Sequence, residues 1–426
     1  MTVLIAGGGI GGLALALTCH QIGVPFKVFE SVARIRPLGV GINLQPSAVR
    51  ELIDLGLQDR LDGIGVRTRD YGMYTRFGLH IWTEPRGTWA GYHWPQYSVH
   101  RGQLHMMLLQ ALQERAGEGC VECGWTATGF ANEGDQAILH LRDAQGRQRT
   151  ERGSLLIGAD GIHSAIRHQI APDEGEPVWG GALLWRGTTM ARPFLTGASM
   201  VMVGYSGLRF VSYPISRPDP VTGLAMINWI ANLNHPPGAP WNKEDWNREA
   251  RLDDFLPQFE GMKFDWLDVP ALIRGADKVF EYPMVDRNPL EQWTFGRVSL
   301  MGDAAHAAYP VGSNGAGSAI IDARKLGRAF VDHGLTPQAL QAYEAQMRPI
   351  TTKVVLTNRV AGPDQILDVV QERCGGRFDR IEDVISKQEL DDHGARYKAI
   401  AGYGIAATNE AAPTLPPGAY ITERTL

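Results

Sequence analysis

The sequence predicts an α/β protein in which a Rossmann-like dinucleotide-binding domain is interrupted by an inserted antiparallel β-sheet domain and followed by a C-terminal helical region. The first observation behind this prediction is the order strand, glycine turn, helix, strand in residues 2–30, where continuous apolar runs are typical of strands buried on both faces. The second is a series of short β-like runs between residues 178 and 282. The third is the return of an apolar strand and a long helix after residue 297, which completes the α/β domain.

Length and composition describe an ordinary globular protein. The chain has 426 residues, of which 44% are hydrophobic and 20% charged, so two or three structural units with ample core are expected. A net charge of -5 provides no positive field for nucleic acid or anionic lipid. The apolar start MTVLIAGGG is too short for a signal peptide, and no run is long enough to span a membrane. We therefore expect a cytoplasmic monomer or homodimer that binds neither nucleic acid nor membrane.

The predicted domain plan alternates between the two main units. We assign residues 1–70, 101–177 and 285–362 to the nucleotide-binding domain, 71–100 and 178–284 to the substrate-binding β domain, and 363–426 to a C-terminal helical tail. The only Cys-x-x-Cys pair, Cys120 and Cys123, lacks a second pair or clustered histidines, so it favours reduced thiols and no metal site.

The first motif is the glycine run at residues 7–12. The Gly-x-Gly-x-x-Gly spacing falls on Gly7, Gly9 and Gly12, directly between a strand and a helix. In such a turn the first glycine permits the bend, the second lets backbone approach a pyrophosphate and the third allows close helix packing. Glu30 ends the next strand, where an acid accepts hydrogen bonds from a ribose. Together these features predict a dinucleotide.

Two later motifs indicate which dinucleotide. They are GADGIHSAIR at 158–167 and GDAAHAAYP at 302–310, and with them the chain resembles the flavoprotein monooxygenases of the aromatic-ring hydroxylase type, which include salicylate and p-hydroxybenzoate hydroxylases. The stretches GVGINLQPSAV and YPVGSNGAGSAIIDA look like the phenazine hydroxylase branch of that family. The resemblance covers nearly the whole chain.

The resemblance implies FAD as the bound cofactor. It places the ADP part at the glycine turn and Glu30, the ribityl hydroxyls at Asp303, and Asp160 beside both FAD and the nicotinamide donor. The full set of FAD-binding residues carried over is Gly7, Gly9, Gly11, Gly12, Glu30, Gly41, Ile42, Arg101, Asp160, Gly302, Asp303, Pro310, Gly312, Asn314 and Gly315.

The resemblance also implies the reaction. NADH or NADPH reduces FAD, O₂ adds to give a flavin C4a-hydroperoxide, and a small aromatic or N-heteroaromatic acid is hydroxylated, with or without loss of its carboxylate. For the substrate we expect contacts from the inserted sheet and the flavin edge. Arg186 has the fork geometry to clamp a carboxylate, or to pair with an acidic residue at the surface. The candidates are Arg186, Tyr205, Tyr213, Met226 and Tyr309, together with Trp185 and Trp229; since strand residues alternate between faces, about half should be core.

Several readings stay open at the level of sequence. His306 is a candidate catalytic base for a phenol, or a brace that hydrogen-bonds to backbone. Asp160 and Arg167 suit a cofactor site, or a salt bridge between turn and helix. Competing functions are a non-catalytic flavin-binding redox protein and a flavin oxidase or dehydrogenase.

Overall fold

The computed structural model describes residues 1–236, 248–313, 315–360, 362, 365–401 and 404–421. Its first unit is built on a parallel sheet whose strand order is β20-β12-β1-β2-β8. The strands are β1 (Val3–Ala6), β2 (Phe26–Glu30), β8 (Val121–Cys123), β12 (Leu155–Gly158) and β20 (Val298–Leu300). All four residues of β1 and of β12 are buried, as the continuous apolar runs predict.

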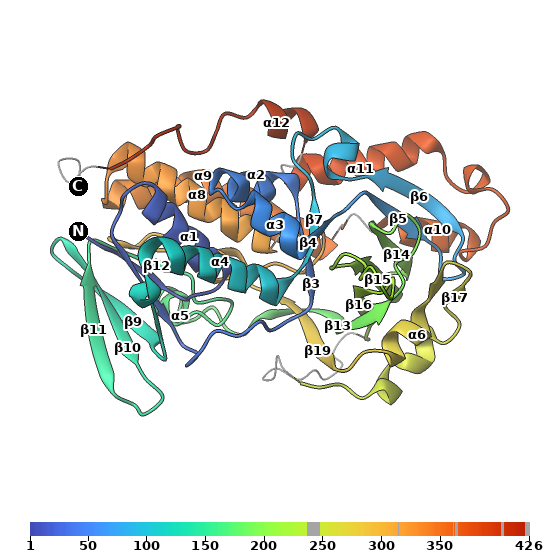
Figure 1. Cartoon of the computed structure of the whole chain (residues 1–426), viewed down its shortest axis with the longest axis horizontal. Helices are drawn as coiled ribbons and strands as arrows, with labels where there is room; N and C mark the ends of the chain where they lie inside the picture. Colours follow the sequence, from blue (N-terminus) through green and yellow to red (C-terminus); the bar gives the residue numbers. More distant parts are fainter. Residues whose placement is uncertain (237–247, 314, 361, 363–364, 402–403, 422–426) are drawn as a thin grey trace.

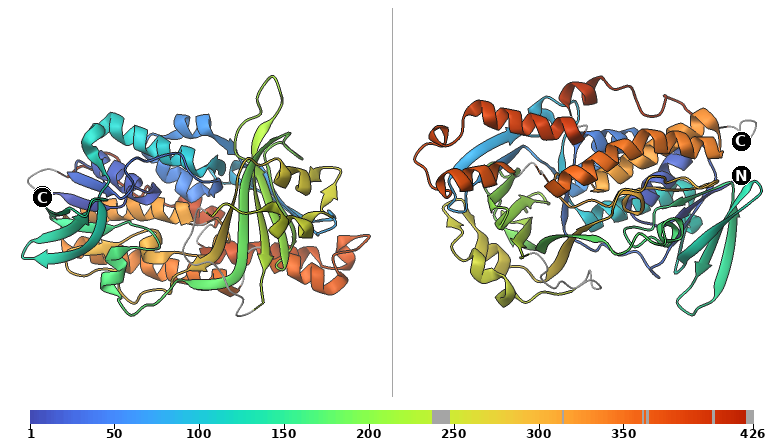
Figure 2. Two further views of the ribbon diagram at one scale, coloured as in Figure 1. Left: turned by 90° about the horizontal axis from the view of Figure 1, so that it is seen from below. Right: turned by 180° about the vertical axis from the view of Figure 1, so that it is seen from behind.

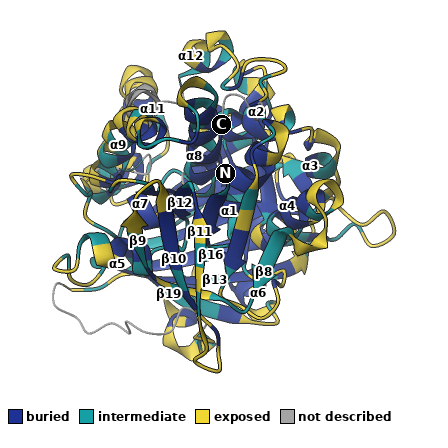
Figure 3. Cartoon of the chain, turned by 90° about the vertical axis from the view of Figure 1, so that its left-hand side faces the viewer, coloured by how far each residue is buried: buried dark blue, intermediate teal, exposed yellow. Residues whose placement is uncertain are grey.

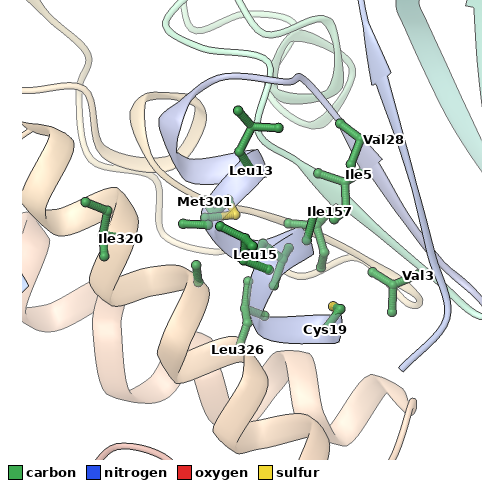
Figure 4. Packing of buried hydrophobic residues seen from close by; sticks show 14 of the residues in the cluster. Val3, Ile5, Leu13, Leu15, Cys19, Val28, Ile157, Met301, Ile320 and Leu326 are labelled. Carbon is green, nitrogen blue, oxygen red and sulfur yellow. The ribbon is translucent and has the colours of Figure 1, made fainter. Parts of the chain in front are cut away.

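Helices cover this sheet and supply most of the core. The apolar face of α1 (Ile10–Gln21) packs against α8 (Gly315–His333) and α4 (Arg101–Ala116), and α8 packs against α9 (Pro337–Val360) and α2 (Pro46–Asp54). Figure 4 shows Leu15 of α1 between Ile157 of β12 and Leu326 of α8. Burial of these side chains at about 25 cal/mol per Å² holds the helices in place.

The inserted domain is a seven-stranded sheet of order β19-β13-β16-β15-β14-β5-β6, seen at the other end of the molecule in Figures 1 and 2. Its strands are β5 (Asp70–Tyr74), β6 (His80–Pro85), β13 (Val178–Ala191), β14 (Ser199–Tyr205), β15 (Leu208–Pro214), β16 (Ala225–Asn234) and β19 (Val279–Asp286). One face packs on α6 (Val269–Arg274) and the 3-10 turns η3 (Leu252–Asp254) and η4 (Leu256–Phe259); the other faces the nucleotide-binding domain and α10 (Gln365–Cys374).

The predicted 71–100 segment is divided between two sheets. β5 and β6 join the seven-stranded sheet, whereas β7 (Tyr97–His100) pairs with β3 (Gly41–Leu44) and β4 (Gly65–Arg67). A separate antiparallel sheet of β9 (Thr126–Glu133), β10 (Gln136–Arg142) and β11 (Gln148–Gly153) projects from the nucleotide-binding end (Figure 1). The remaining short elements are α3 (Gln58–Ile64), α5 (Ala165–Ile170), α7 (Asp303–His306), η1 (Gly87–Ala90), η2 (Glu118–Cys120), η5 (Ile381–Asp383), β17 (Lys263–Phe264) and β18 (Leu267–Asp268).

Part of the C-terminal region packs into the core of the nucleotide-binding domain. After α11 (Lys387–Ala401) and α12 (Ile405–Glu410), the chain runs back over the nucleotide-binding domain, where Leu415 and Ile421 enter its main hydrophobic cluster. The amide of Ile421 donates to the carbonyl of Ile22 at 2.8 Å. Figure 3 shows exposed residues on α12 and the other outer helices around the buried strands. No helix in the described ranges is long and apolar enough to cross a bilayer.

Candidate active site

The three sequence motifs meet at the carboxyl edge of the parallel sheet. Gly7 follows β1, Asp160 follows β12 and Asp303 follows β20, and registers such as Ala6 with Gly158 and Gly158 with Leu300 align these strand ends. From β1 the chain continues to β2 on one side, while β12 lies on the other, so the glycine turn sits where the strand order reverses. Nucleotides bind at this point of open α/β sheets.

The glycines of the turn have different surroundings. A Cβ on Gly7, whose φ is +109°, would lie 2.3 Å from the carbonyl oxygen of Ala159, and one on Gly12 would lie 2.0 Å from that of Gly7. A Cβ on Gly11 would press on Ala319 of α8 at 3.1 Å, whereas one on Gly9 would meet nothing within 4 Å. Gly7 and Gly12 are therefore required by packing, Gly11 allows the close approach of Ala319, and Gly9 leaves open space at the start of α1.

Glu30 and a histidine from α4 fix the conformation of this turn. One carboxylate oxygen of Glu30 accepts the amide of Gly8 at 2.7 Å, and the other accepts the amide of Val32 and the hydroxyl of Ser31, both at 3.0 Å. Nε2 of His105 lies 2.6 Å from the carbonyl oxygen of Gly8. Burial lowers the pKa of His105, so its neutral form donates this hydrogen bond.

Asp160 caps the short helix α5. Its carboxylate accepts the hydroxyl of Ser164 at 2.5 Å and the amide of Ala165 at 2.9 Å, and burial raises its pKa. The salt bridge considered between Asp160 and Arg167 does not form. Arg167 pairs with Glu174 instead, and its guanidinium also donates to the carbonyls of Ala304 and Ala305 at 3.0 and 2.8 Å. The Asp-Gly segment is thus tied to α7.

At the end of β20, Gly302 turns the chain at φ +58° and Asp303 begins α7. The carboxylate of Asp303 is exposed and has no hydrogen bond or ion pair within the described part of the chain. His306 is buried, and its Nε2 lies 2.6 Å from Oδ2 of Asp322 on α8. The bond that braces His306 is therefore to a side chain and not, as considered from the sequence, to the backbone.

The loop that follows reaches the inserted sheet. Asn358 of α9 donates to the carbonyls of Tyr309 and Val311 at 3.2 and 3.1 Å, which positions Pro310 and Gly312 beside a cavity. Gly312 has φ +75°. Gly315 starts α8 directly after this loop, and the predicted FAD ligand Asn314 lies outside the described residues.

A second junction joins the two domains at β3. The amide of Gly41 donates to Oδ1 of Asn228 at 2.7 Å, and its carbonyl accepts from Arg186 at 2.9 Å. A Cβ on Gly41 would lie 2.6 Å from the Asn228 side chain, so glycine allows this approach. Ile42 is half-buried next along β3, and the exposed Arg101 begins α4 with its amide bonded to Val40.

A cavity lies between the inserted sheet, β3, the η1 segment and the loop after Tyr309. Among the residues that the structure describes, its lining combines apolar side chains with three arginines and contains no carboxylate. The lining residues are Asn43, Gln45, Tyr71, Pro85, Arg86, Gly87, Tyr92, Gln96, Leu184, Arg186, Met200, Met202, Arg209, Val211, Tyr213, Ile230, Asn232, Met284, Pro310, Val311, Gly312 and Ser313.

Of the predicted substrate contacts, Arg186 and Tyr213 line this cavity. Tyr205 ends β14 at the hairpin and packs with the α10 cluster, and Met226 lies towards the far end of β16, so neither lines the cavity. Tyr309 is buried behind Pro310, with its hydroxyl 3.4 Å from the carbonyl of Val178. Trp185 and Trp229 belong to the opposite face and its core, as the strand alternation predicts for part of the set.

Sequence reasoning missed four polar residues of the site: Arg86, Arg209, His105 and Asp322. Arg209 occupies the same face as Tyr213 in the run LRFVSYP, so strand alternation from Tyr213 is a signal that identifies it. His105 and Asp322 lie on helices, and only the packing of α4 and α8 brings them to the motif loops. Cys120 and Cys123 carry free thiols, and no group of three metal-ligating side chains occurs among the residues that the structure describes.

Comparison with known proteins agrees with this geometry. The FAD binding domain family matches residues 1–181 and 278–358. The chain is 42% identical over 361 residues to the phenazine 1,6-dicarboxylic acid hydroxylase PhzS of Lysobacter antibioticus, covering 84% of this chain and 89% of that protein. It is 31% identical over 387 residues to a salicylate hydroxylase of Pseudomonas putida, covering 85% of each. The structure of Klebsiella pneumoniae HpxO with FAD and uric acid superposes with a TM-score of 0.73 at 22% identity, over 96% and 97% of the two chains.

The residues at the sheet edge fit FAD. Gly9 leaves open the space that a pyrophosphate needs, and the exposed carboxylate of Asp303 stands at the adjoining strand end as an acceptor for sugar hydroxyls. The match to the FAD binding domain family and the relatives at 30% identity or more extend over most of the chain, and the inserted sheet is consistent with them. This protein therefore belongs to the FAD-dependent aromatic hydroxylases, the flavoprotein monooxygenases that hydroxylate aromatic compounds.

Proposed function

We propose that the chain hydroxylates a small aromatic or N-heteroaromatic acid, held in the cavity between the inserted sheet and the loop 310–313, with NADH or NADPH as electron donor and O₂ as oxidant. The observation that carries this proposal is the cavity itself, whose described lining combines apolar side chains with three arginines and no carboxylate. Such a lining suits a flat ring bearing a negative charge. The relatives named for phenazine dicarboxylate and salicylate act on compounds of this class.

Arg186 is the proposed anchor for the substrate carboxylate. Its guanidinium donates to the Gly41 carbonyl, stacks 5.8 Å from the Tyr282 ring centroid, and keeps a buried Nε without a partner among the described residues. Burial lowers its pKa, and the charge of Arg101 acts in the same direction. A carboxylate ligand would offset both effects, because it pairs with the charged guanidinium.

Tyr213 lies beside this anchor and is proposed to contact the substrate. Burial raises its pKa to about 12, although the charge of Arg186 opposes that shift. Its hydroxyl therefore stays protonated at neutral pH and serves as a hydrogen-bond donor.

FAD would be held by the glycine turn, Glu30, Asp303 and the loop 310–312, and it supplies the transfer of electrons from the nicotinamide to oxygen. Around it, the protein's own residues bind and orient the ring and exclude water. The apolar wall of Met200, Met202, Val211 and Ile230 limits solvent at the reacting ring.

The test is a panel of salicylates, hydroxynicotinates and phenazine carboxylates offered to purified holoenzyme with NADH or NADPH in ¹⁸O₂. We expect one class to stimulate donor oxidation and to give a product that carries one labelled oxygen. Donor oxidation with unlabelled product would identify an oxidase or dehydrogenase instead. No stimulation across the panel would favour a non-catalytic flavin protein.

We further propose a cytoplasmic monomer or homodimer. Its four cysteines are all free thiols, in keeping with a reducing compartment. Light scattering of the purified holoenzyme measures the oligomeric state directly, and a mass above that of a dimer would overturn this part of the proposal.

A further inference from the structure

One buried polar group of the cavity plays no part in holding a carboxylate. Gln96 lines the cavity and is only 2% exposed, and its side-chain oxygen Oε1 is buried without a hydrogen-bond partner among the described residues. A buried polar group without a partner destabilises a fold, and such groups are uncommon in native proteins. The partner that this carboxamide lacks must then come from outside the described part of the chain.

The other buried carboxamides of the cavity wall are paired within the protein. Oδ1 of Asn43 accepts the hydroxyl of Ser98 at 2.5 Å, and its Nδ2 donates to the sulfur of Met200 at 3.6 Å. Oδ1 of Asn232 accepts a guanidinium N–H at 2.8 Å. Both neighbours are therefore satisfied by the fold, and Gln96 differs from them in keeping its acceptor oxygen unpaired.

The backbone on either side of Gln96 is fixed. Its carbonyl accepts the amide of Thr68 at 2.9 Å, and the next residue, Tyr97, begins β7. On the other side lies Gly87 of η1, where φ is +53° and a Cβ would stand 2.4 Å from the backbone nitrogen of Gln96. Glycine allows this close approach, so Gln96 is held in place beside the cavity. A group that is already fixed loses less entropy when a ligand binds.

A carboxamide is suited to recognising a hydroxyl group. It offers an acceptor oxygen and two donor N–H groups, and a hydroxyl can both donate and accept a hydrogen bond. A hydrogen or a halogen at the same ring position donates nothing, so it would leave the buried oxygen of Gln96 unpaired. Because the carboxamide carries no charge, it selects for a neutral group and complements the cation of Arg186.

We propose that Gln96 is a specificity-determining residue whose carboxamide hydrogen-bonds a hydroxyl already present on the substrate ring, while Arg186 holds the carboxylate. This inference rests on the proposed function and narrows its substrate class to aromatic acids that carry a neutral hydroxyl before oxygen is transferred. An acid without that hydroxyl binds more weakly, because the carboxamide stays unpaired. Gln96 orients the ring and takes no part in proton or oxygen transfer.

The test uses pairs of aromatic acids that differ at one ring position, where one acid carries a hydroxyl and the other a fluorine, which donates no hydrogen bond. Hydroxy- and fluorobenzoates and the corresponding naphthoates are titrated into oxidised holoenzyme, with dissociation constants measured from the change in flavin absorbance. At one ring position or more, wild type should bind the hydroxy acid at least about tenfold more tightly than its fluoro partner.

Variants of Gln96 connect this preference to the carboxamide. Gln96→Met keeps the length of the side chain, and should weaken the preferred hydroxy acid about tenfold while changing its fluoro partner and phenazine-1-carboxylate less than about threefold. Gln96→Glu keeps an acceptor at the same reach, so the preference for the hydroxyl should remain although the added charge weakens binding of every acid. Gln341→Met, at an exposed position of α9, is the matched control and should change no ligand.

Flavin content and melting temperature separate recognition from folding. Removing an unpaired polar group from the interior should leave the melting temperature of ligand-free Gln96→Met at or above that of wild type. A melting temperature several degrees lower, or loss of flavin, would assign the carboxamide to the fold and overturn the proposal.

Three binding results would also overturn it: equal affinity of wild type for both acids of every pair, a preference that survives in Gln96→Met, or binding of phenazine-1-carboxylate alone. If an acid is hydroxylated while one of these results holds, the proposed function stands without the role of Gln96. If no acid binds or is oxidised, both proposals fail.

Discussion

His306 and Asp322 form a buried pair directly behind the Gly302-Asp303 turn, with 2.6 Å between imidazole Nε2 and carboxylate Oδ2. The same oxygen of Asp322 accepts the amide of Gly302 at 2.8 Å. Asp322 thus fixes both ends of the turn that presents Asp303. Trp293 lies 5.6 Å from the imidazole, between ring centroids, which leaves little room for water around the pair. This arrangement favours a positioning role for His306 over that of a base in contact with substrate.

The first prediction concerns the charge of this pair. Burial disfavours the imidazolium, but the charge and hydrogen bond of Asp322 and the charge of Asp303 outweigh it and raise the pKa of His306. Asp322 also faces Tyr343 of α9, whose pKa is raised well above its usual range. Asp322→Asn should therefore cost about 2–4 kcal/mol of unfolding free energy and weaken FAD binding. Denaturant unfolding of the apoprotein and flavin titration measure the two effects.

The pH dependence of stability tests the same pair. A histidine with a raised folded-state pKa adds stability that is complete below about pH 6.5, the unfolded value, and is lost as the pH rises through the folded pKa. Wild-type apoprotein should therefore lose unfolding free energy relative to His306→Asn as the pH rises above 6.5. Parallel stability curves for the two proteins over this range would contradict a protonated His306.

The second prediction concerns Asp303. Its exposed carboxylate has no partner among the described residues, so removing it should leave the fold intact while removing an acceptor for FAD. We expect Asp303→Ala to bind FAD about 10- to 100-fold more weakly, from the loss of charge-assisted hydrogen bonds. Flavin absorbance of the purified protein measures this, with Asp332→Ala at the far end of α8 as control. Full flavin content in Asp303→Ala would exclude the assigned role.

The third prediction separates two glycines of one motif. A methyl group fits at Gly9, where φ is -72° and nothing lies within 4 Å, so Gly9→Ala should fold normally and bind FAD weakly because the methyl fills the open space. Gly12→Ala would place Cβ 2.0 Å from the Gly7 carbonyl, so it should destabilise the protein itself. Melting temperatures of the apoproteins together with flavin titrations distinguish the variants. Normal FAD affinity in a folded Gly9→Ala would refute the assignment.

The fourth prediction tests Arg186 in turnover. Arg186→Lys keeps a positive charge but loses the planar fork that reaches Gly41, so KM for the aromatic acid should rise about tenfold or more, with a smaller change in kcat. Steady-state kinetics with the best substrate of the panel measures this, and flavin content serves as the control. A KM equal to that of wild type would remove Arg186 from the substrate site.

The fifth prediction concerns the C-terminal helix α12. Asn409 accepts the amide of His93 at 2.9 Å and donates to the carbonyl of Gly91 at 2.8 Å, so it holds the turn whose middle residue, Tyr92, lines the cavity. Asn409→Ala should raise KM a few-fold and leave flavin content unchanged, because exposed hydrogen bonds contribute about 0.5–1.5 kcal/mol each. Asn409→Asp, which keeps one of the two bonds, should lie between. Loss of FAD in Asn409→Ala would point to a general structural role instead.

The sequence by itself determined the nucleotide-binding half of this protein. Gly7, Gly12 and the apolar strand before them constrain backbone geometry within a few residues, and local geometry is what a motif encodes. The family resemblance implied that the protein binds FAD and hydroxylates aromatic compounds, and the comparisons agree. In the structure, the glycine, Asp-Gly and Gly-Asp motifs lie together at one edge of the parallel sheet.

Only the tertiary structure decided which side chains face the cavity. Strand alternation predicts two faces of the sheet but not which face lines the cavity, so the sequence does not distinguish Trp229 from Tyr213. The packing of one face against α6 and of the other against the nucleotide-binding domain places Trp229 in the core and Tyr213 at the cavity. Arg209, His105 and Asp322 each have a hydrogen-bond partner between 16 and 97 residues away in the chain. Such contacts depend on the packing of whole elements, because no local pattern specifies which helix or strand will lie against another.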